Sequence, residues 1–244
     1  MPNRYARPPI IEAVISIQFA DEIPVRSREK LKDRLKKDYP NVEDIAQHQF
    51  GFGPGHYVFS PPTIIGHKLL STDLLNIIMI TPKELIISRL SPYAGWEDLF
   101  GKGQQVWSIF MNVIGRKIVS RLGTRYINRI DIPSTNESEI DTTKYVRIGI
   151  SVPNHQALEV YNVETVFPLK KKPFKAVMRT STVKSPLIGY SSIMLDLDVY
   201  INEDISQDDA DIWNVINSFR DLKDELFESC ITDRTRELFN RAKN

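Results

Sequence analysis

The sequence predicts an α+β protein of two halves, each with an antiparallel or mixed sheet packed on one or two helices. Several short segments alternate apolar and polar residues, most clearly over 10–19, and this period of two is typical of half-buried strands. Longer segments repeat apolar residues every three or four positions, as amphipathic helices do. A polar stretch over 134–143 is the candidate linker, so we expect an N-terminal half over 1–133 and a C-terminal half over 144–244.

The first half follows the order of a ferredoxin-like domain with additional strands. In the strand over 10–19, Ala13 and Ile15 share one face and Glu12 lies on the other. A charged helix is expected over 27–39, with Ser27 as its N-cap, and a second helix over 95–114, in which Gly101 and Gly103 favour a break. Further strands are expected at 68–81, 84–91 and 123–133, and the glycine-rich, aromatic segment 47–59 is expected to be a strand that leads into a loop.

The second half is rich in strands and ends in helices. Its strands are expected at 145–152, 158–168, 174–183 and 192–202. A long helix follows, with an apolar stripe at Ile212, Ile216, Phe219, Leu222, Leu226 and Cys230. Thr232 or Asp233 is placed to cap a short last helix.

The composition limits the classes of partner. Lys and Arg number 32 against 31 Asp and Glu, so a net charge of +1 supplies no overall attraction to nucleic acid or to an anionic membrane. A single cysteine excludes an intrachain disulfide and fits a reducing compartment. No apolar run approaches the roughly 18 residues that span a bilayer. We therefore expect a soluble cytoplasmic protein without a membrane partner.

Charged residues in the middle of two predicted strands form the first candidate site. Arg125, Arg129 and Asp131 share one strand face, and Asp196 and Asp198 share a face of another strand. If both strands belong to one sheet, guanidinium–carboxylate pairs would satisfy these charges, and Glu12 is a further candidate member. The set predicts either a pocket for an anionic ligand, in a receptor or hydrolase, or a structural ion-pair network on a sheet face.

The second candidate site is the basic region of the chain, flanked by Phe167 and Phe174. Its members are Lys170, Lys171, Lys172, Lys175, Arg179 and Lys184. Basic residues beside aromatic rings favour single-stranded nucleic acid, and the alternative is a solvated hairpin tip whose lysines discourage aggregation.

No catalytic residue, metal site or cofactor site emerges from the other motifs. The four histidines, His48, His56, His67 and His155, lack the spacing of a metal site. Asp196 and Asp198 point the same way, as ligands of a hard cation can, but no further ligand completes the set. Cys230 lies on an apolar stripe, which favours a core position, and the glycine-rich segment over 51–55 lacks the phosphate-loop pattern.

Four segments resemble a bacterial protein family of about this length that is sporadically distributed and has no characterised activity. They are 7–14 (RPPIIEAV), 123–130 (GTRYINRI), 195–200 (LDLDVY) and 227–233 (FESCITD), and the Arg-Tyr-Ile-Asn-Arg-Ile segment is the most specific. The resemblance implies a bacterial accessory protein, for example in phage defence or toxin neutralisation. Our leading hypothesis is a non-enzymatic interaction protein that binds a protein partner or forms a homo-oligomer.

Overall fold

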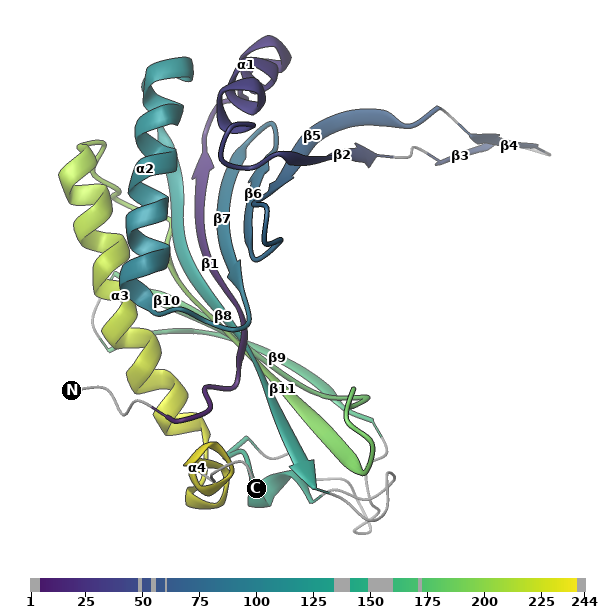
Figure 1. The fold of residues 1–244 in the computed structure, drawn as a ribbon, viewed down its shortest axis with the longest axis vertical. Coiled ribbons are helices and arrows are strands. Elements are labelled where there is room, and N and C mark those ends of the chain that lie inside the picture. Colours follow the sequence, from purple (N-terminus) through teal and green to yellow (C-terminus); the bar gives the residue numbers. More distant parts are fainter. Residues whose placement is uncertain are drawn as a thin grey trace.

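The protein is built around one twisted antiparallel sheet of nine strands (Figure 1). The structure, a computed structural model, describes residues 5–47, 50–53, 56–59, 61–133, 141–148, 160–170 and 173–240. The strand order is β2-β5-β6-β7-β1-β8-β11-β10-β9, and every neighbouring pair is antiparallel. A separate two-stranded sheet, β3-β4, continues the arm that β2 and β5 extend from the body.

The strands and helices alternate irregularly along the chain. The strands are β1 (Ile10–Phe19), β2 (Asn41–Gln47), β3 (Phe50–Gly53), β4 (His56–Phe59), β5 (Thr63–Leu70), β6 (Asn76–Ile80), β7 (Glu84–Leu90), β8 (Val119–Pro133), β9 (Asn162–Pro168), β10 (Lys175–Val183) and β11 (Tyr190–Ile201). The helices are α1 (Val25–Leu35), α2 (Trp96–Ile114), the 3₁₀ turn η1 (Thr142–Lys144), α3 (Asp209–Cys230) and α4 (Asp233–Asn240).

The prediction of two halves with separate sheets is wrong. β8 has 15 residues, and it pairs with β1 along one edge and with β11 along the other. Strands from both ends of the chain therefore join one sheet through β8. Within this sheet, however, β6-β7-β1-β8 are in ferredoxin-like order, with α1 after β1 and α2 between β7 and β8, and the other strands extend this unit at both edges.

Three further predictions differ from the structure in detail. Segment 68–81 holds the end of β5 and all of β6, with a turn between them, whereas one strand was expected there. α1 begins two residues before Ser27, after Pro24, and no side chain caps it. In place of a strand from 145, the described residues form η1 and a single bridge between Val146 and Ile231.

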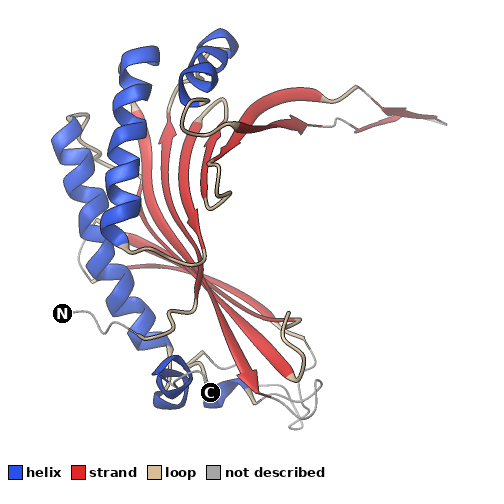
Figure 2. Cartoon of the chain, in the orientation of Figure 1, coloured by secondary structure: helices blue, strands red, loops and turns tan. Residues whose placement is uncertain are grey.

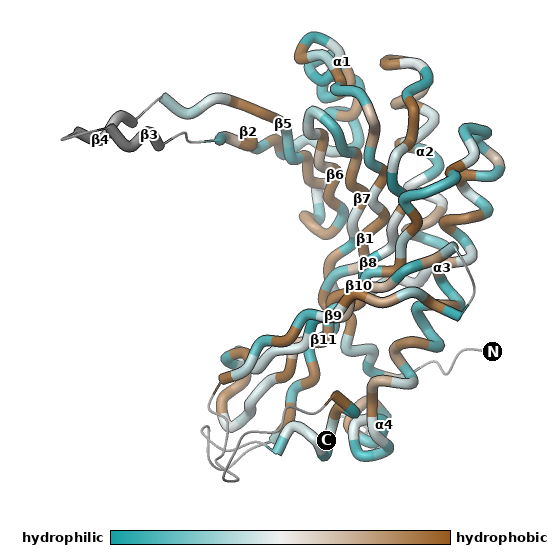
Figure 3. The backbone as a smooth tube through the Cα atoms, turned by 180° about the vertical axis from the view of Figure 1, so that it is seen from behind, coloured by the Kyte–Doolittle hydropathy of each residue, from teal (hydrophilic) through white to brown (hydrophobic). Residues whose placement is uncertain are grey.

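The helices cover one face of the sheet (Figure 2). Leu31 of α1, Phe110 of α2 and Ile216 of α3 join one core cluster with Ile15 of β1, and all four side chains are fully buried. A second cluster joins Phe239 of α4 to the far ends of β8 and β11. In Figure 3 the hydrophobic colours gather along the central strands β1, β6 and β7, whereas α1 is mainly hydrophilic. The described residues place no helix on the opposite face, which we call the helix-free face.

α2 runs without a break through both of its glycines, contrary to the sequence prediction. At Gly103, an added Cβ atom would lie 2.8 Å from the ring of Trp213 on α3 and 3.3 Å from Ile15 on β1. The glycine therefore lets α2 approach both elements, and the packing gained there offsets the low helix propensity of glycine. Within the described residues, no helix is long and apolar enough to cross a membrane.

Candidate functional site

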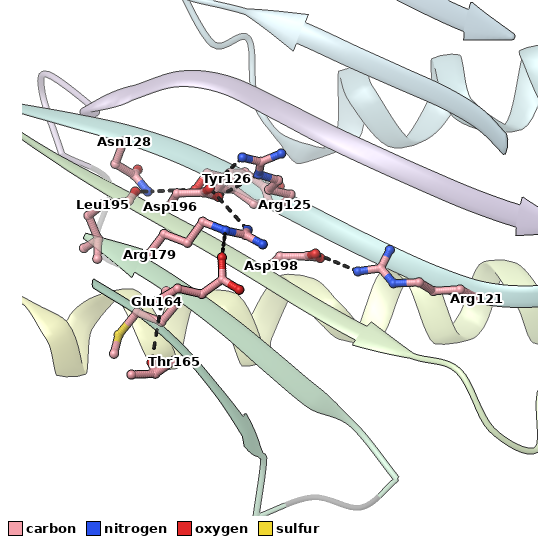
Figure 4. Close-up of polar contacts among 11 residues, drawn as sticks. Arg121, Arg125, Tyr126, Asn128, Glu164, Thr165, Arg179, Leu195, Asp196 and Asp198 are labelled. Carbon is pink, nitrogen blue, oxygen red and sulfur yellow. Dashed lines mark hydrogen bonds and ion pairs between the residues drawn. The ribbon is translucent and has the colours of Figure 1, made fainter. Parts of the chain in front are cut away.

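The charged residues predicted from the sequence lie together on the helix-free face. Side chains alternate between the two faces of a strand, so Arg125, Arg129 and Asp131 leave β8 on the side opposite the helices. The pairing of β8 with β11 sets Asp198 directly across from Arg125, and Asp196 one position further along the same face. Positively and negatively charged side chains therefore alternate on this face (Figure 4). We call this set the charged field, and its members are Arg121, Arg125, Arg129, Asp131, Arg179, Asp196 and Asp198.

The centre of this field is the pair of Arg125 and Asp196. Arg125 donates from Nε and Nη2 to the two carboxylate oxygens of Asp196, at 2.7 and 2.6 Å. The Asp196 side chain is only 5% exposed, whereas that of Arg125 is 42% exposed. Arg179 of β10 reaches the same carboxylate at 3.5 Å and binds Glu164 of β9 at 2.5 Å, so the network spans four strands. The carboxylate raises the pKa of Arg125 above its usual range.

A second pair joins Arg121 to Asp198 at 2.6 Å. The Arg121 guanidinium also lies over the ring of Tyr200, 4.5 Å from its centroid. Gly123 makes this geometry accessible, because a Cβ atom there would lie 2.6 Å from the guanidinium. Burial raises the pKa of the Asp198 carboxyl although Arg121 lowers it, so at this site desolvation outweighs the ion pair.

Two of the predicted residues stand apart from this centre. Arg129 binds Asp131 on its own strand at 2.9 and 3.2 Å, and Ser192 donates to Asp131 at 2.5 Å. Glu12 lies on the same face, opposite Leu90 and Ile127, and acts on Arg125 through its charge. All six predicted residues therefore share the helix-free face, where five of them belong to three ion pairs and Glu12 lies beside them.

The basic region is partly neutralised where the structure describes it. Lys175 binds Glu203 at 2.6 Å, and Arg179 is bound to Glu164 and Asp196. Lys170 precedes β10 and Lys184 follows it. Lys171 and Lys172, the centre of the predicted patch, lie outside the described residues, as do His48 and His155.

The outer edge of β9 borders the charged field. β9 closes the sheet on this side, and among the described strands it pairs only with β10. The Thr182 amide donates to the Tyr161 carbonyl at 3.2 Å, and the Leu169 amide donates to the Phe174 carbonyl at 2.8 Å. Since hydrogen-bonded positions alternate in antiparallel pairs, the odd-numbered residues of β9 bond to β10. The even-numbered Asn162, Glu164 and Val166 therefore direct their backbone groups outward.

A cavity of about 580 Å³ lies on the other face, between the N-terminal segment, the start of α2 and the second half of α3. Its lining includes Tyr93, Tyr126, Asn128 and Lys223. Sequence reasoning missed this site, although Lys223 gives a signal. It stands four residues after Phe219 and four before Phe227, so it occupies the apolar face of α3. A lysine at such a position must bury its ammonium group or reach a partner.

Among the described residues, no group of three or more His, Cys, Asp or Glu side chains is placed to hold a metal ion. Burial raises the pKa of the Cys230 thiol, as expected for a core cysteine. No protein-family model matches the chain, and no curated protein matches it. The family resemblance described above therefore stays a prediction.

Proposed function

We propose that the protein is a non-enzymatic interaction protein whose immediate partner is a second copy of the same chain, joined along β9. The observation that carries this proposal is the outer edge of β9, which pairs with no other strand in the part of the chain that the structure describes. An edge strand with unpaired N–H and C=O groups is a template for another strand. The side chain of Val166, in the middle of this edge, is 59% exposed.

The sequence of β9 is compatible with antiparallel pairing to itself. When Thr165 lies on the twofold axis, Glu164 faces Val166 of the second copy, and Asn162 faces Pro168. No like charges are then opposite one another, and only Pro168 lacks a donor. The one charge of β9, on Glu164, is bound by Arg179 within the chain.

The opposite edge of the sheet lacks these properties. β2 carries Glu43 and Asp44 side by side in its middle, and both side chains are at least half exposed. Charges in the centre of an edge strand discourage pairing between chains. Lys68 and His67 bind Glu43 and Asp44, as Arg179 binds Glu164, so the edges differ in carrying two adjacent charges on β2 against one on β9, and this difference favours β9.

The ion pairs of the charged field support a structural role for this face of the sheet. Arg121, Arg125, Arg129 and Arg179 each bind a carboxylate, so their charges are satisfied within the chain. The same pairs weaken the alternative of an anionic-ligand receptor on this face. The ion pairs of Lys175 and Arg179 likewise weaken the alternative of a nucleic-acid binder. The accessory bacterial role implied by the family resemblance stays a prediction.

The proposal is tested by the association state of matched variants at position 166. Val166→Pro removes an outward amide and leaves every β9–β10 hydrogen bond in place, whereas Val166→Thr keeps the amide and the side-chain shape. We expect sedimentation velocity to give a dimer for the wild type and for Val166→Thr, and a monomer for Val166→Pro. Circular dichroism checks that all three are folded. A wild-type monomer across the accessible concentration range, or a dimer of Val166→Pro, would refute the proposal.

A further inference from the structure

The cavity beside α3 has a polar floor and a more exposed acidic rim. Tyr126 and Asn128 of β8 and Lys223 of α3 are at most 8% exposed. Glu225, by contrast, is exposed at the solvent side. Asn128 is fixed at the floor, because its amide group donates to the backbone carbonyls of Leu195 and Tyr126, at 3.0 and 3.3 Å.

Lys223 supplies the positive charge of the floor. Its ammonium group lies 3.8 Å from the centroid of the Tyr126 ring and forms an ion pair with Asp224. An ammonium group has three protons. The aspartate uses one of them, and the ring face attracts the charge without accepting a conventional hydrogen bond. The group therefore has hydrogen-bonding capacity left for a ligand.

The two tyrosines supply a second donor. The hydroxyl groups of Tyr93 and Tyr126 are 3.1 Å apart, and one of them donates to the other. Each hydroxyl has one proton, so the accepting tyrosine keeps its own proton for another partner. The cavity lining thus offers an ammonium group over the ring of Tyr126 and a phenol proton from the tyrosine pair that includes the same residue.

The walls between the floor and the rim are largely apolar. Pro8, Pro9 and Ile10 form one side, and Trp96 and Phe227 form part of the others. The Trp96 ring is fixed by a hydrogen bond from its Nε1 to Asn217 at 2.8 Å. Apolar walls around a few convergent polar groups are typical of small-molecule sites.

We propose that this cavity binds a small organic acid that has one carboxylate and an apolar, preferably aromatic, body. The carboxylate accepts hydrogen bonds from Lys223 and from the free tyrosine hydroxyl at the floor. The body lies against Trp96 and Phe227. The cavity lies on the helix-covered face, whereas the charged field lies on the helix-free face and β9 lies at the edge of the sheet. Ligand binding in the cavity therefore does not depend on dimer formation.

The charges of the rim exclude a second negative group on the ligand. Four carboxylates line the cavity: Glu97, Asp224 and Glu228 form ion pairs with Arg220, Lys223 and Arg236, whereas Glu225, exposed at the rim, has no cation partner among the described residues. Glu228 is held in place by Tyr5, which donates to it at 2.5 Å, and by Arg236 at 2.9 Å. A dicarboxylate that extends from the floor to the rim would therefore meet repulsion.

The test is isothermal titration of the full chain with phenylbutyrate, with its neutral amide phenylbutyramide, and with phenylbutyrate that carries a second carboxylate on the ring. We expect the acid to bind at least about tenfold more tightly than the amide, because a hydrogen bond between charged groups is stronger than one to a neutral amide. The dicarboxylate should bind more weakly than the acid. Equal affinities for acid and amide, or no binding of the acid, would overturn the proposal.

Variants locate the carboxylate. Lys223→Met keeps the apolar stem and should remove the preference for acid over amide, and Tyr93→Phe should reduce it by removing one hydroxyl without a change of shape. Glu237→Gln, on the exposed surface of α4 outside the cavity lining, is the control and should keep the preference. If Lys223→Met is folded by circular dichroism and still prefers the acid, the assignment of Lys223 is wrong. If it is unfolded, the Tyr93→Phe result decides.

The pH dependence gives an independent readout. Lys223 lies over the ring of Tyr126, and the charged groups that act on it are Asp224, Arg220 and Asp221, all on α3. Burial lowers the pKa of its ammonium group, and a bound carboxylate raises that pKa again. The affinity for phenylbutyrate should therefore fall as the pH rises through the pKa of the unliganded lysine. An affinity that is constant until tyrosine ionises would contradict a role for this ammonium group.

Discussion

Removal of Arg125 should destabilise the protein, and simultaneous removal of Asp196 should restore most of the loss. The Asp196 carboxylate is nearly fully buried, and Arg125 provides both of its short hydrogen bonds, at 2.7 and 2.6 Å. In Arg125→Met, only Arg179 at 3.5 Å would remain to compensate the buried charge. In the double variant with Asp196→Leu, neither charge is left, and two apolar side chains lie across the strands.

The magnitude follows from the burial of the two groups. Loss of one partner from a fully buried pair costs about 3–5 kcal/mol, whereas an exposed pair contributes about 0.2–1 kcal/mol. Since the Arg125 side chain is 42% exposed, we expect Arg125→Met to lower the free energy of unfolding by about 2 kcal/mol. Asp196→Leu should cost about 1 kcal/mol, because solvent can reach the remaining guanidinium. The double variant should lie within about 1 kcal/mol of the wild type, since apolar replacement of a buried pair is often neutral.

Urea unfolding of the wild type, the two single variants and the double variant gives the coupling energy of a double-mutant cycle, provided that the m-value is unchanged. The exposed pair of Lys175, at the start of β10, and Glu203, in the turn after β11, is the control and should show no coupling outside the error. Additive effects of Arg125→Met and Asp196→Leu would refute the structural role. A stable Arg125→Met protein would then indicate that the arginine serves a ligand.

Three further predictions concern single positions. The pKa of the Asp198 carboxyl is raised in the folded state, so its contribution to stability is greatest below the unfolded pKa and is lost as the pH rises through the folded pKa. The stability of the wild type relative to Asp198→Asn should therefore fall over this pH range in urea titrations, and a constant difference would contradict the shift. On α2, Gly101→Ala should raise the unfolding free energy by about 0.5–1 kcal/mol, since no atom obstructs the new methyl group. Gly103→Ala should lower the unfolding free energy by about 1–3 kcal/mol, because the new methyl group would collide with the ring of Trp213. If thermal melts show that both substitutions stabilise the protein, Trp213 moves aside at little cost and the prediction is wrong. The buried thiol of Cys230 should react with Ellman's reagent only after unfolding, and rapid labelling of the native protein would contradict its burial.

Local patterns predicted individual elements well. The strand over 10–19 matches β1 to the residue, because a period of two specifies both the element and its buried face. The apolar stripe from Ile212 to Cys230 predicted α3, and Asp208 caps that helix by accepting from the amides of Ala210 and Asp211. These features depend only on neighbours along the chain.

Features that depend on distant pairing were not predictable in the same way. The sequence contains a polar segment after Pro133, which suggested a division of the chain, but strand pairing is decided by contacts far apart in the sequence. β8 pairs with β11 over the 12 positions from Tyr190↔Pro133 to Ile201↔Leu122, and this ladder makes one sheet of both ends of the chain. The cavity likewise requires Tyr126, Tyr93 and Lys223 to meet from three separate segments. From the sequence, a lysine on the apolar face of a predicted helix identifies Lys223, but no comparable pattern identifies Tyr93 or Tyr126 as its neighbours in the cavity.

The Arg-Tyr-Ile-Asn-Arg segment connects the two surfaces, because alternate residues of β8 belong to different faces. Arg125 joins the ion-pair network on the helix-free face, whereas Tyr126 and Asn128 form the floor of the cavity. A register slip of one residue would move the arginines toward the core and the tyrosine into solvent, so the pair of Arg125 and Asp196 also fixes the cavity floor. The double variant Arg125→Met/Asp196→Leu separates these effects. If the ladder between β8 and β11 alone maintains the register, this variant should bind phenylbutyrate as the wild type does. A stable double variant with weakened binding would show that the ion pair positions Tyr126 through the strand that they share.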